Sequence, residues 1–149
     1  MEKHKKVLFC TDLSEACDPA FTYALDLVAR EGGELDILHV LPYQANHGMA
    51  ESYLSETKSR KLKDAFRQEL RSICSDRYGV KIAGRVPFSM VTVSGAPEEE
   101  IIKYAEKKGA DLIVMGGEAG RRLSHVFNGR LTDRVAKHSK ITVLIVPSK

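Results

Sequence analysis

Cysteine is scarce in this sequence, and its spacing is not that of a structural framework. The 149 residues include three cysteines, Cys10, Cys17 and Cys74, and no two of them form a C-x-x-C pair. This spacing argues against a disulfide scaffold and a zinc knuckle, and it predicts reduced thiols that pack as small hydrophobic side chains. The five histidines are scattered along the chain, so we expect no metal site.

Long hydrophobic runs and a strong excess of one charge are missing as well. The basic N-terminal residues are followed by an apolar run, residues 7–10, that is too short for a signal peptide or a membrane span. The net charge is only +3, and the few aromatic residues, 7% of the chain, are dispersed. Nucleic-acid binding needs a large basic face with aromatic platforms, so we expect no nucleic-acid partner. From the short apolar run we expect a cytoplasmic protein without a membrane partner.

The motifs of several common enzyme families are also absent. The sequence contains no G-x-x-x-x-G-K-[ST] P-loop, no G-x-G-x-x-G after the first apolar run and no G-x-S-x-G nucleophile elbow. No Ser, His and Asp set lies at matching loop positions. We therefore expect no catalytic residues of a strong hydrolase.

What the sequence does contain is enough apolar material for one compact domain over residues 1–149, since 43% of the residues are hydrophobic. Short continuous apolar runs predict strands that are buried on both faces, as in a parallel sheet. Five such runs occur, at residues 7–10, 35–41, 88–93, 111–115 and 141–146.

Helical periodicity separates these runs. It predicts a first helix over about residues 15–31 and, after a stretch without periodicity, a long second helix that ends before Gly79. Pro97 and Gly109 fit the first position and the end of a third helix, which has glutamates in its first turn and lysines in its last. A final helix covers about residues 131–138.

Alternating strands and helices predict a doubly wound α/β fold, Rossmann-like, in which a five-stranded parallel sheet has helices on both faces. In such sheets ligands bind beyond the carboxyl ends of the strands, near the point where the strand order reverses. The segments that follow the first, second and fourth strands are residues 11–12, 40–42 and 116–129, and any binding site is expected there.

The segment after the fourth predicted strand is rich in glycine. Gly116, Gly117 and Gly120 follow the strand, and Gly129 precedes the last helix. Accessible backbone N–H groups next to a helix N-terminus would suit a phosphate group. The same composition is also compatible with an ordinary flexible loop, so glycine alone does not establish a site.

Further segments have a recognisable order along the whole chain. They are residues 7–15, 38–40, 95–101, 110–116 and 143–147. Together they resemble the universal stress protein family, whose domain is similar to adenine nucleotide alpha hydrolases. The resemblance implies a stress-response regulatory module that acts as a homodimer through its last strand. The protein partners through which it would act are not indicated by the sequence.

The ATP-binding branch of this family carries a Gly-x2-Gly-x9-Gly-Ser/Thr loop after the fourth strand. The resemblance implies ATP or another adenine nucleotide as ligand, with Mg when it is bound. It assigns the aspartate after the first strand to the adenine side and the residues after the second strand to the base pocket. The implied nucleotide-binding residues are Thr11, Asp12, Val40, Met115, Gly116, Gly117, Ala119, Gly120, Gly129, Arg130, Leu131 and Thr132.

Two positions depart from the family loop. Counting back from Gly129 places Ala119 where the second glycine is expected, and Arg130 replaces the hydroxyl residue. An alanine forced to positive φ costs on the order of 1 kcal/mol. Gly117 and Gly120 offer a Gly-x-x-Gly that is one residue out of register, and Arg130 either grips a phosphate or pairs with Asp133. We therefore expect a partly degraded ATP pocket.

Simpler roles are open for several of these residues. Asp12 and Ser14 are both good helix caps, and Thr132 fits an ordinary helix position. His39 lies within a predicted buried strand, where we expect a hydrogen-bonded core histidine and not a ligand. The alternative function is a slow ATP-hydrolysing enzyme, for which Glu118 and Asp12 are the loop residues that could orient water.

Overall fold

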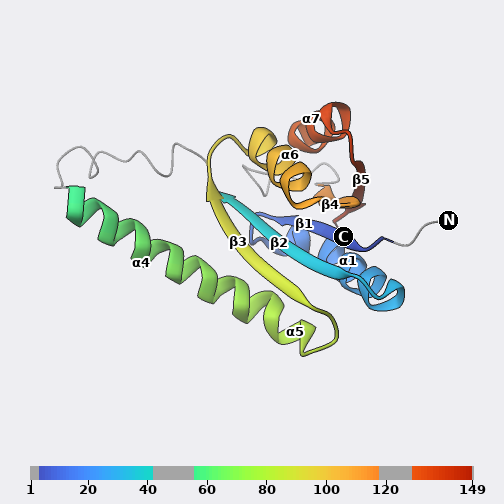
Figure 1. Cartoon of the computed structure of the whole chain (residues 1–149), viewed down its shortest axis with the longest axis horizontal. Coiled ribbons are helices and arrows are strands. Elements are labelled where there is room, and N and C mark those ends of the chain that lie inside the picture. Colours follow the sequence, from blue (N-terminus) through green and yellow to red (C-terminus); the bar gives the residue numbers. More distant parts are fainter. Residues whose placement is uncertain (1–3, 42–55, 118–128, 149) are drawn as a thin grey trace.

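The computed structural model describes residues 4–41, 56–117 and 129–148. Five parallel strands form one sheet in the order β3-β2-β1-β4-β5, which confirms the predicted fold class (Figure 1). Each predicted apolar run became a strand with shifts of one or two residues at its ends. The strands are β1 (Lys6–Thr11), β2 (Glu34–Leu41), β3 (Phe88–Ser94), β4 (Leu112–Gly117) and β5 (Thr142–Pro147).

Helices cover both faces of the sheet. The helical segments are η1 (Glu15–Cys17), α1 (Asp18–Glu31), α4 (Glu56–Cys74), η2 (Ser75–Gly79), α5 (Val80–Ile82), α6 (Pro97–Lys108) and α7 (Gly129–His138). In Figure 1, α1, α4 and α5 lie on one face, and α6 and α7 lie on the other. None of the helices in the described part of the chain is long and apolar enough to cross a membrane.

The core is centred on β1, the middle strand. Its side chains from Val7 to Cys10 are buried, as the continuous apolar run predicts. On the α1 face, the Phe9 ring lies 5.6 Å from that of Phe21 and 5.4 Å from that of Tyr78, measured between ring centroids. The edge strands differ from the prediction, because β3 and β5 are only partly buried.

The ends of α6 follow its sequence signals. Pro97 is the first residue, where its missing N–H leaves no helical hydrogen bond unmade. Gly109 ends the helix in the left-handed region at φ +69°, a conformation that glycine adopts without strain. Acidic side chains in the first turn and lysines in the last complement the helix dipole.

The predicted end of the second helix is wrong. Gly79 has helical angles, φ −57° and ψ −42°, and the helix continues through a π turn, η2, into α5. Burial explains the continuation, because Tyr78 and Ile82 on either side of Gly79 are fully buried in the core. The chain leaves the helix at Ala83, which has a φ of +43°.

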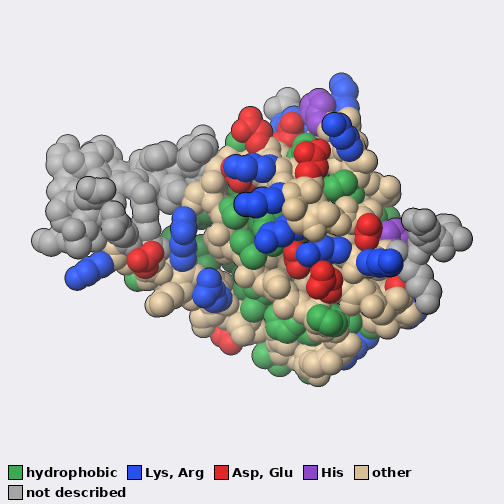
Figure 2. Space-filling view, viewed as in Figure 1, with side chains coloured by type: hydrophobic (Ala, Val, Ile, Leu, Met, Phe, Trp, Pro, Cys, Tyr) green, Lys and Arg blue, Asp and Glu red, His purple; other side chains and the backbone are tan. Residues whose placement is uncertain are grey.

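The long helix α4 also buries less of its apolar face than its periodicity predicts. Leu70 and Cys74 are buried against the sheet, but Phe66 and Ile73 are 43% and 42% exposed. On the face of the molecule seen in Figure 2, basic and acidic side chains are interspersed, and no patch of a single sign covers it.

Candidate functional site

The strand order reverses between β1 and β4. From β1 the chain adds β2 and β3 on one side of the sheet and then crosses to add β4 and β5 on the other. Cys10 is paired in register with Met115, so the ends of these two strands lie side by side. The structure therefore brings the predicted site residues Thr11, Asp12 and Gly116 to the place where ligands bind in doubly wound sheets.

Asp12 fixes the turn that follows β1. Its Oδ1 atom accepts hydrogen bonds from the backbone N–H of Ser14 at 2.9 Å, from Ser14 Oγ at 2.5 Å and from Cys17 Sγ at 3.1 Å. The turn passes through Leu13 at φ +69°, which costs a non-glycine residue energy. The alternative role of Asp12 or Ser14 as a side-chain cap of α1 is not found. Ser14 is the N-cap residue of η1, Cys17 is that of α1, and neither makes a side-chain cap hydrogen bond.

Two buried hydroxyl groups, those of Thr11 and Tyr78, stabilise the same turn from the core side. Thr11 Oγ1 accepts a hydrogen bond from the Leu13 N–H at 2.9 Å and shares a hydrogen bond of 2.5 Å with the Tyr78 hydroxyl. Thr11 and Tyr78 are both fully buried. Burial raises the pKa of Tyr78, so this phenol stays neutral in the physiological range.

Sequence reasoning missed Tyr78 as part of the site. The residue lies in a polar stretch, Ser75–Gly79, with no motif that marks it. Arg77 next to it forms an ion pair with Asp18 at 2.9 Å, and its guanidinium lies 5.9 Å from the centroid of the Tyr78 ring. Only the tertiary structure brings η2 against the end of β1.

His39 near the end of β2 is buried as expected, being 6% exposed. The expected hydrogen bond is absent at one ring nitrogen, because His39 Nδ1 is buried with no partner among the described residues. Burial lowers the pKa of His39, and the negative charge of Asp12 partly opposes this shift. The imidazole is therefore held neutral near pH 7.

The two glycines at the end of β4 have packing roles of their own. A Cβ at Gly116 would lie 3.2 Å from the carbonyl oxygen of Ala16 and 3.3 Å from the Cα of Cys17. A Cβ at Gly117 would lie 2.9 Å from Ile145 Cγ2. Gly116 thus allows η1 to approach β4 closely, and Gly117 makes room for β5.

The remaining predicted residues fall into two groups. Val40, Met115, Leu131 and Thr132 are buried, and Gly129 is the first residue of α7. Ala119 and Gly120 lie outside the described residues, as does the side chain of Arg130. The structure thus places the β1, β2 and β4 sides of the predicted site and leaves the loop of the phosphate side outside its description.

The described part of this site suits a ligand with an anionic end. Because β4 ends at the carboxyl edge and α7 leads back to the start of β5, the N-terminus of α7 points toward that edge. A helix N-terminus that begins with glycine favours an anion such as phosphate. Among the described residues, no group of three or more His, Cys, Asp or Glu is placed to hold a metal ion.

The chain is similar over nearly its whole length to proteins of one family. Residues 3–147 match the universal stress protein family. Universal stress protein MJ0531 of Methanocaldococcus jannaschii is 29% identical over 145 residues, which cover 96% of this chain and 82% of the relative.

Solved structures agree with the sequence match. The structure of MJ0577, from the same organism, has a TM-score of 0.78 and 26% identity and covers 99% of both chains. A universal stress protein in complex with cAMP shares the fold, with a TM-score of 0.63 and 23% identity over 99% of this chain and 100% of the other.

Proposed function

Because this chain belongs to the universal stress protein family, we propose that it is a cytoplasmic stress-response module that binds an adenine nucleotide, ATP with Mg in the first instance, where β1, β2 and β4 end. The observation that carries the proposal is the fixed Asp12 turn at the reversal of strand order. A polar turn of this kind can present hydrogen-bonding groups to a base, while the N-terminus of α7 offers a place for phosphate.

The fold itself supports a nucleotide as the ligand. A family member is described in complex with cAMP, so the family fold is able to hold an adenine nucleotide. In this chain, Thr11, Asp12 and the backbone at Val40 would contact the nucleoside side, and Gly129–Thr132 would contact the phosphates. Bound ATP would bring its charged phosphates and Mg to the carboxyl edge of the sheet.

Of the two alternative functions, we favour nucleotide binding without efficient hydrolysis. The Asp12 Oδ1 atom is engaged by three donors that hold its own turn, which makes this carboxylate a positioning group and a poor choice for orienting water. Glu118, the other acid considered for hydrolysis, lies outside the described residues. The module therefore acts by holding nucleotide and contacting partners.

Assembly as a homodimer is part of the proposal. β5 is an edge strand of the sheet, and its Ile145 side chain is 37% exposed. An unpaired apolar edge favours antiparallel pairing with the same strand of a second copy, which gives a two-fold interface.

One assay separates binding from hydrolysis. Purified protein is mixed with ATP and Mg, and bound nucleotide and released phosphate are measured on the same sample. Retained ATP without turnover supports the binding module, whereas turnover that Asp12→Ala abolishes supports the slow enzyme. Asp26→Ala, which removes a surface carboxylate paired with Arg85, is the control and should change neither reading.

A further inference from the structure

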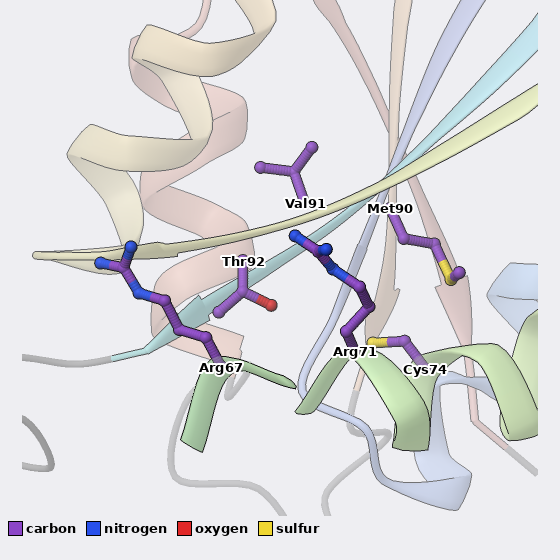
Figure 3. A pocket seen from close by; sticks show the side chains of 6 residues that line it. All are labelled: Arg67, Arg71, Cys74, Met90, Val91 and Thr92. Carbon is purple, nitrogen blue, oxygen red and sulfur yellow. The ribbon is translucent and has the colours of Figure 1, made fainter. Parts of the chain in front are cut away.

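A cleft lies between α4 and β3, away from the candidate nucleotide site. It is lined by Arg67, Arg71 and Cys74 from the helix and by Met90, Val91 and Thr92 from the strand, and its volume is about 130 Å³. Figure 3 shows both arginine side chains extending from α4 toward β3, with Thr92 between them. None of these residues belongs to the nucleotide site proposed above.

The two arginines differ from the other arginines that the structure describes. Arg77, Arg85 and Arg134 each form an ion pair with a carboxylate, at 2.9, 3.2 and 2.8 Å, and Arg30 donates a hydrogen bond to the backbone oxygen of Asp26 at 3.4 Å. Arg67 and Arg71 have no hydrogen-bond or ion-pair partner within the described ranges. Their spacing of four residues places them on one face of the helix, where like charges repel. Two exposed guanidinium groups thus line the cleft, and no described carboxylate pairs with either of them.

The remaining lining adds no negative charge. Cys74 is buried, and burial raises the pKa of its thiol, so this side chain is neutral near pH 7. Thr92 contributes a half-buried hydroxyl with no hydrogen-bond partner among the described side chains. The cleft therefore offers two cationic forks and one hydroxyl, a combination suited to an oxyanion.

The size of the cleft limits the ligand. A volume of 130 Å³ corresponds to about four water molecules at roughly 30 Å³ each. Pockets for drug-sized ligands are larger, about 300–1,000 Å³. One tetrahedral oxyanion fits this volume, whereas a whole nucleotide would extend beyond the cleft.

We propose that the cleft between α4 and β3 is a binding site for a single phosphate-type oxyanion, held by Arg67 and Arg71 with a contact from the Thr92 hydroxyl. Binding neutralises the repulsion between the two guanidinium groups and connects α4 to the edge strand. The cleft and the proposed nucleotide pocket share no lining residue.

The test is calorimetric titration with inorganic phosphate at constant ionic strength. The wild type is compared with Arg67→Gln/Arg71→Gln and with the control Arg30→Gln/Arg85→Gln. The control removes the same charge from another two-arginine cleft, which already contains the Asp26 carboxylate. We expect phosphate affinity to fall at least tenfold in the first variant and to be unchanged in the control.

Thermal unfolding provides a second measurement. Phosphate should raise the Tm of the wild type and of the control, but not that of Arg67→Gln/Arg71→Gln. A titration with phenyl phosphate distinguishes a free ion from a phosphate group on a larger molecule. If the ester binds more weakly than inorganic phosphate, the site is specific for the free ion. If both bind equally well, the site accepts phosphate groups in general. Wild-type protein that binds neither compound, or equal losses in both variants, would overturn the proposal.

Discussion

Thr11 and Tyr78 are 67 residues apart in the sequence, and their side-chain oxygens lie 2.5 Å apart beneath the turn that carries Asp12. This hydrogen bond joins the end of β1 to η2, the π turn that follows α4. The Thr11 hydroxyl also accepts a hydrogen bond from the Leu13 N–H. Tyr78 therefore supports the turn of the candidate site indirectly, through Thr11.

Replacing Tyr78 with Phe should destabilise the turn that carries Asp12, because the hydrogen bond to Thr11 is lost. We expect the free energy of unfolding to fall by about 1–2 kcal/mol, since one buried hydrogen bond is lost while the ring packing stays. If about 1 kcal/mol of that loss falls on the turn, nucleotide affinity drops roughly fivefold. Urea unfolding and calorimetry measure the two effects.

Tyr104→Phe is the matched control for this prediction. Tyr104 donates a hydrogen bond to Asp36 at 3.2 Å from α6, on the other face of the sheet. Its loss should affect stability and leave nucleotide binding as it is in the wild type. Equal losses of affinity in the two variants would rule out a special role for Tyr78.

His39 predicts a dependence of stability on pH. Its pKa is lowered in the folded state, so below about pH 6.5 the unfolded chain takes up a proton that the native protein does not. Stability should therefore fall as the pH drops from 7.5 toward 5.5. Urea unfolding across this range should show that slope reduced in His39→Gln. An unchanged slope in His39→Gln would contradict the assignment.

Gly116 predicts a packing cost that is separate from any ligand. In Gly116→Ala the new Cβ meets backbone atoms of Ala16 and Cys17 at 3.2 and 3.3 Å, so η1 must shift. We expect a loss of about 1–3 kcal/mol in the free energy of unfolding. Gly109→Ala is the comparison, because it has open space and only the strain of positive φ, about 1 kcal/mol. A Gly116→Ala protein as stable as the wild type would refute close packing of η1.

The dimer prediction concerns the β5 edge. Ile145→Lys places a charge on the exposed side of that strand and should shift the protein from dimer to monomer in light scattering at micromolar concentration. Val80→Lys is the control, since Val80 is 71% exposed on α5, away from the edge, and should leave the dimer intact. A wild type that is already monomeric at these concentrations would refute the interface.

The sheet could be predicted well because buried parallel strands carry their signal locally. Continuous apolar runs marked β1, β2 and β4, and Pro97 and Gly109 marked both ends of α6. The error at Gly79 arose because the helix end there is determined by tertiary packing and not by a local sequence signal. There, burial of the neighbouring Tyr78 and Ile82 outweighs the weak helix propensity of glycine, and no nearby residue reveals that burial.

In the candidate site, too, some features could be predicted from the sequence pattern and others depend on tertiary packing. The place of Asp12 at the carboxyl edge of the sheet could be predicted, because the residue directly follows the first strand; its role toward a ligand came only from the family resemblance and stays a prediction. The contacts of Tyr78 with Thr11 and of Asp12 with Cys17 depend on how η2 and η1 pack, which the sequence pattern does not encode. Arg67 and Arg71 are exposed side chains, and only the packing of α4 against β3 makes them part of a cleft.

Calorimetric titration of Mg-ATP into the wild type and the Ala119→Gly/Arg130→Ser double variant tests whether the carboxyl edge of the sheet holds an adenine nucleotide. If position 119 has the positive φ that the family loop implies, glycine there gains about 1 kcal/mol, and serine at position 130 would return one hydrogen bond to a charged phosphate. We expect measurable binding by the wild type and roughly 30–100-fold tighter binding by the variant. No binding by either protein at millimolar Mg-ATP would contradict it.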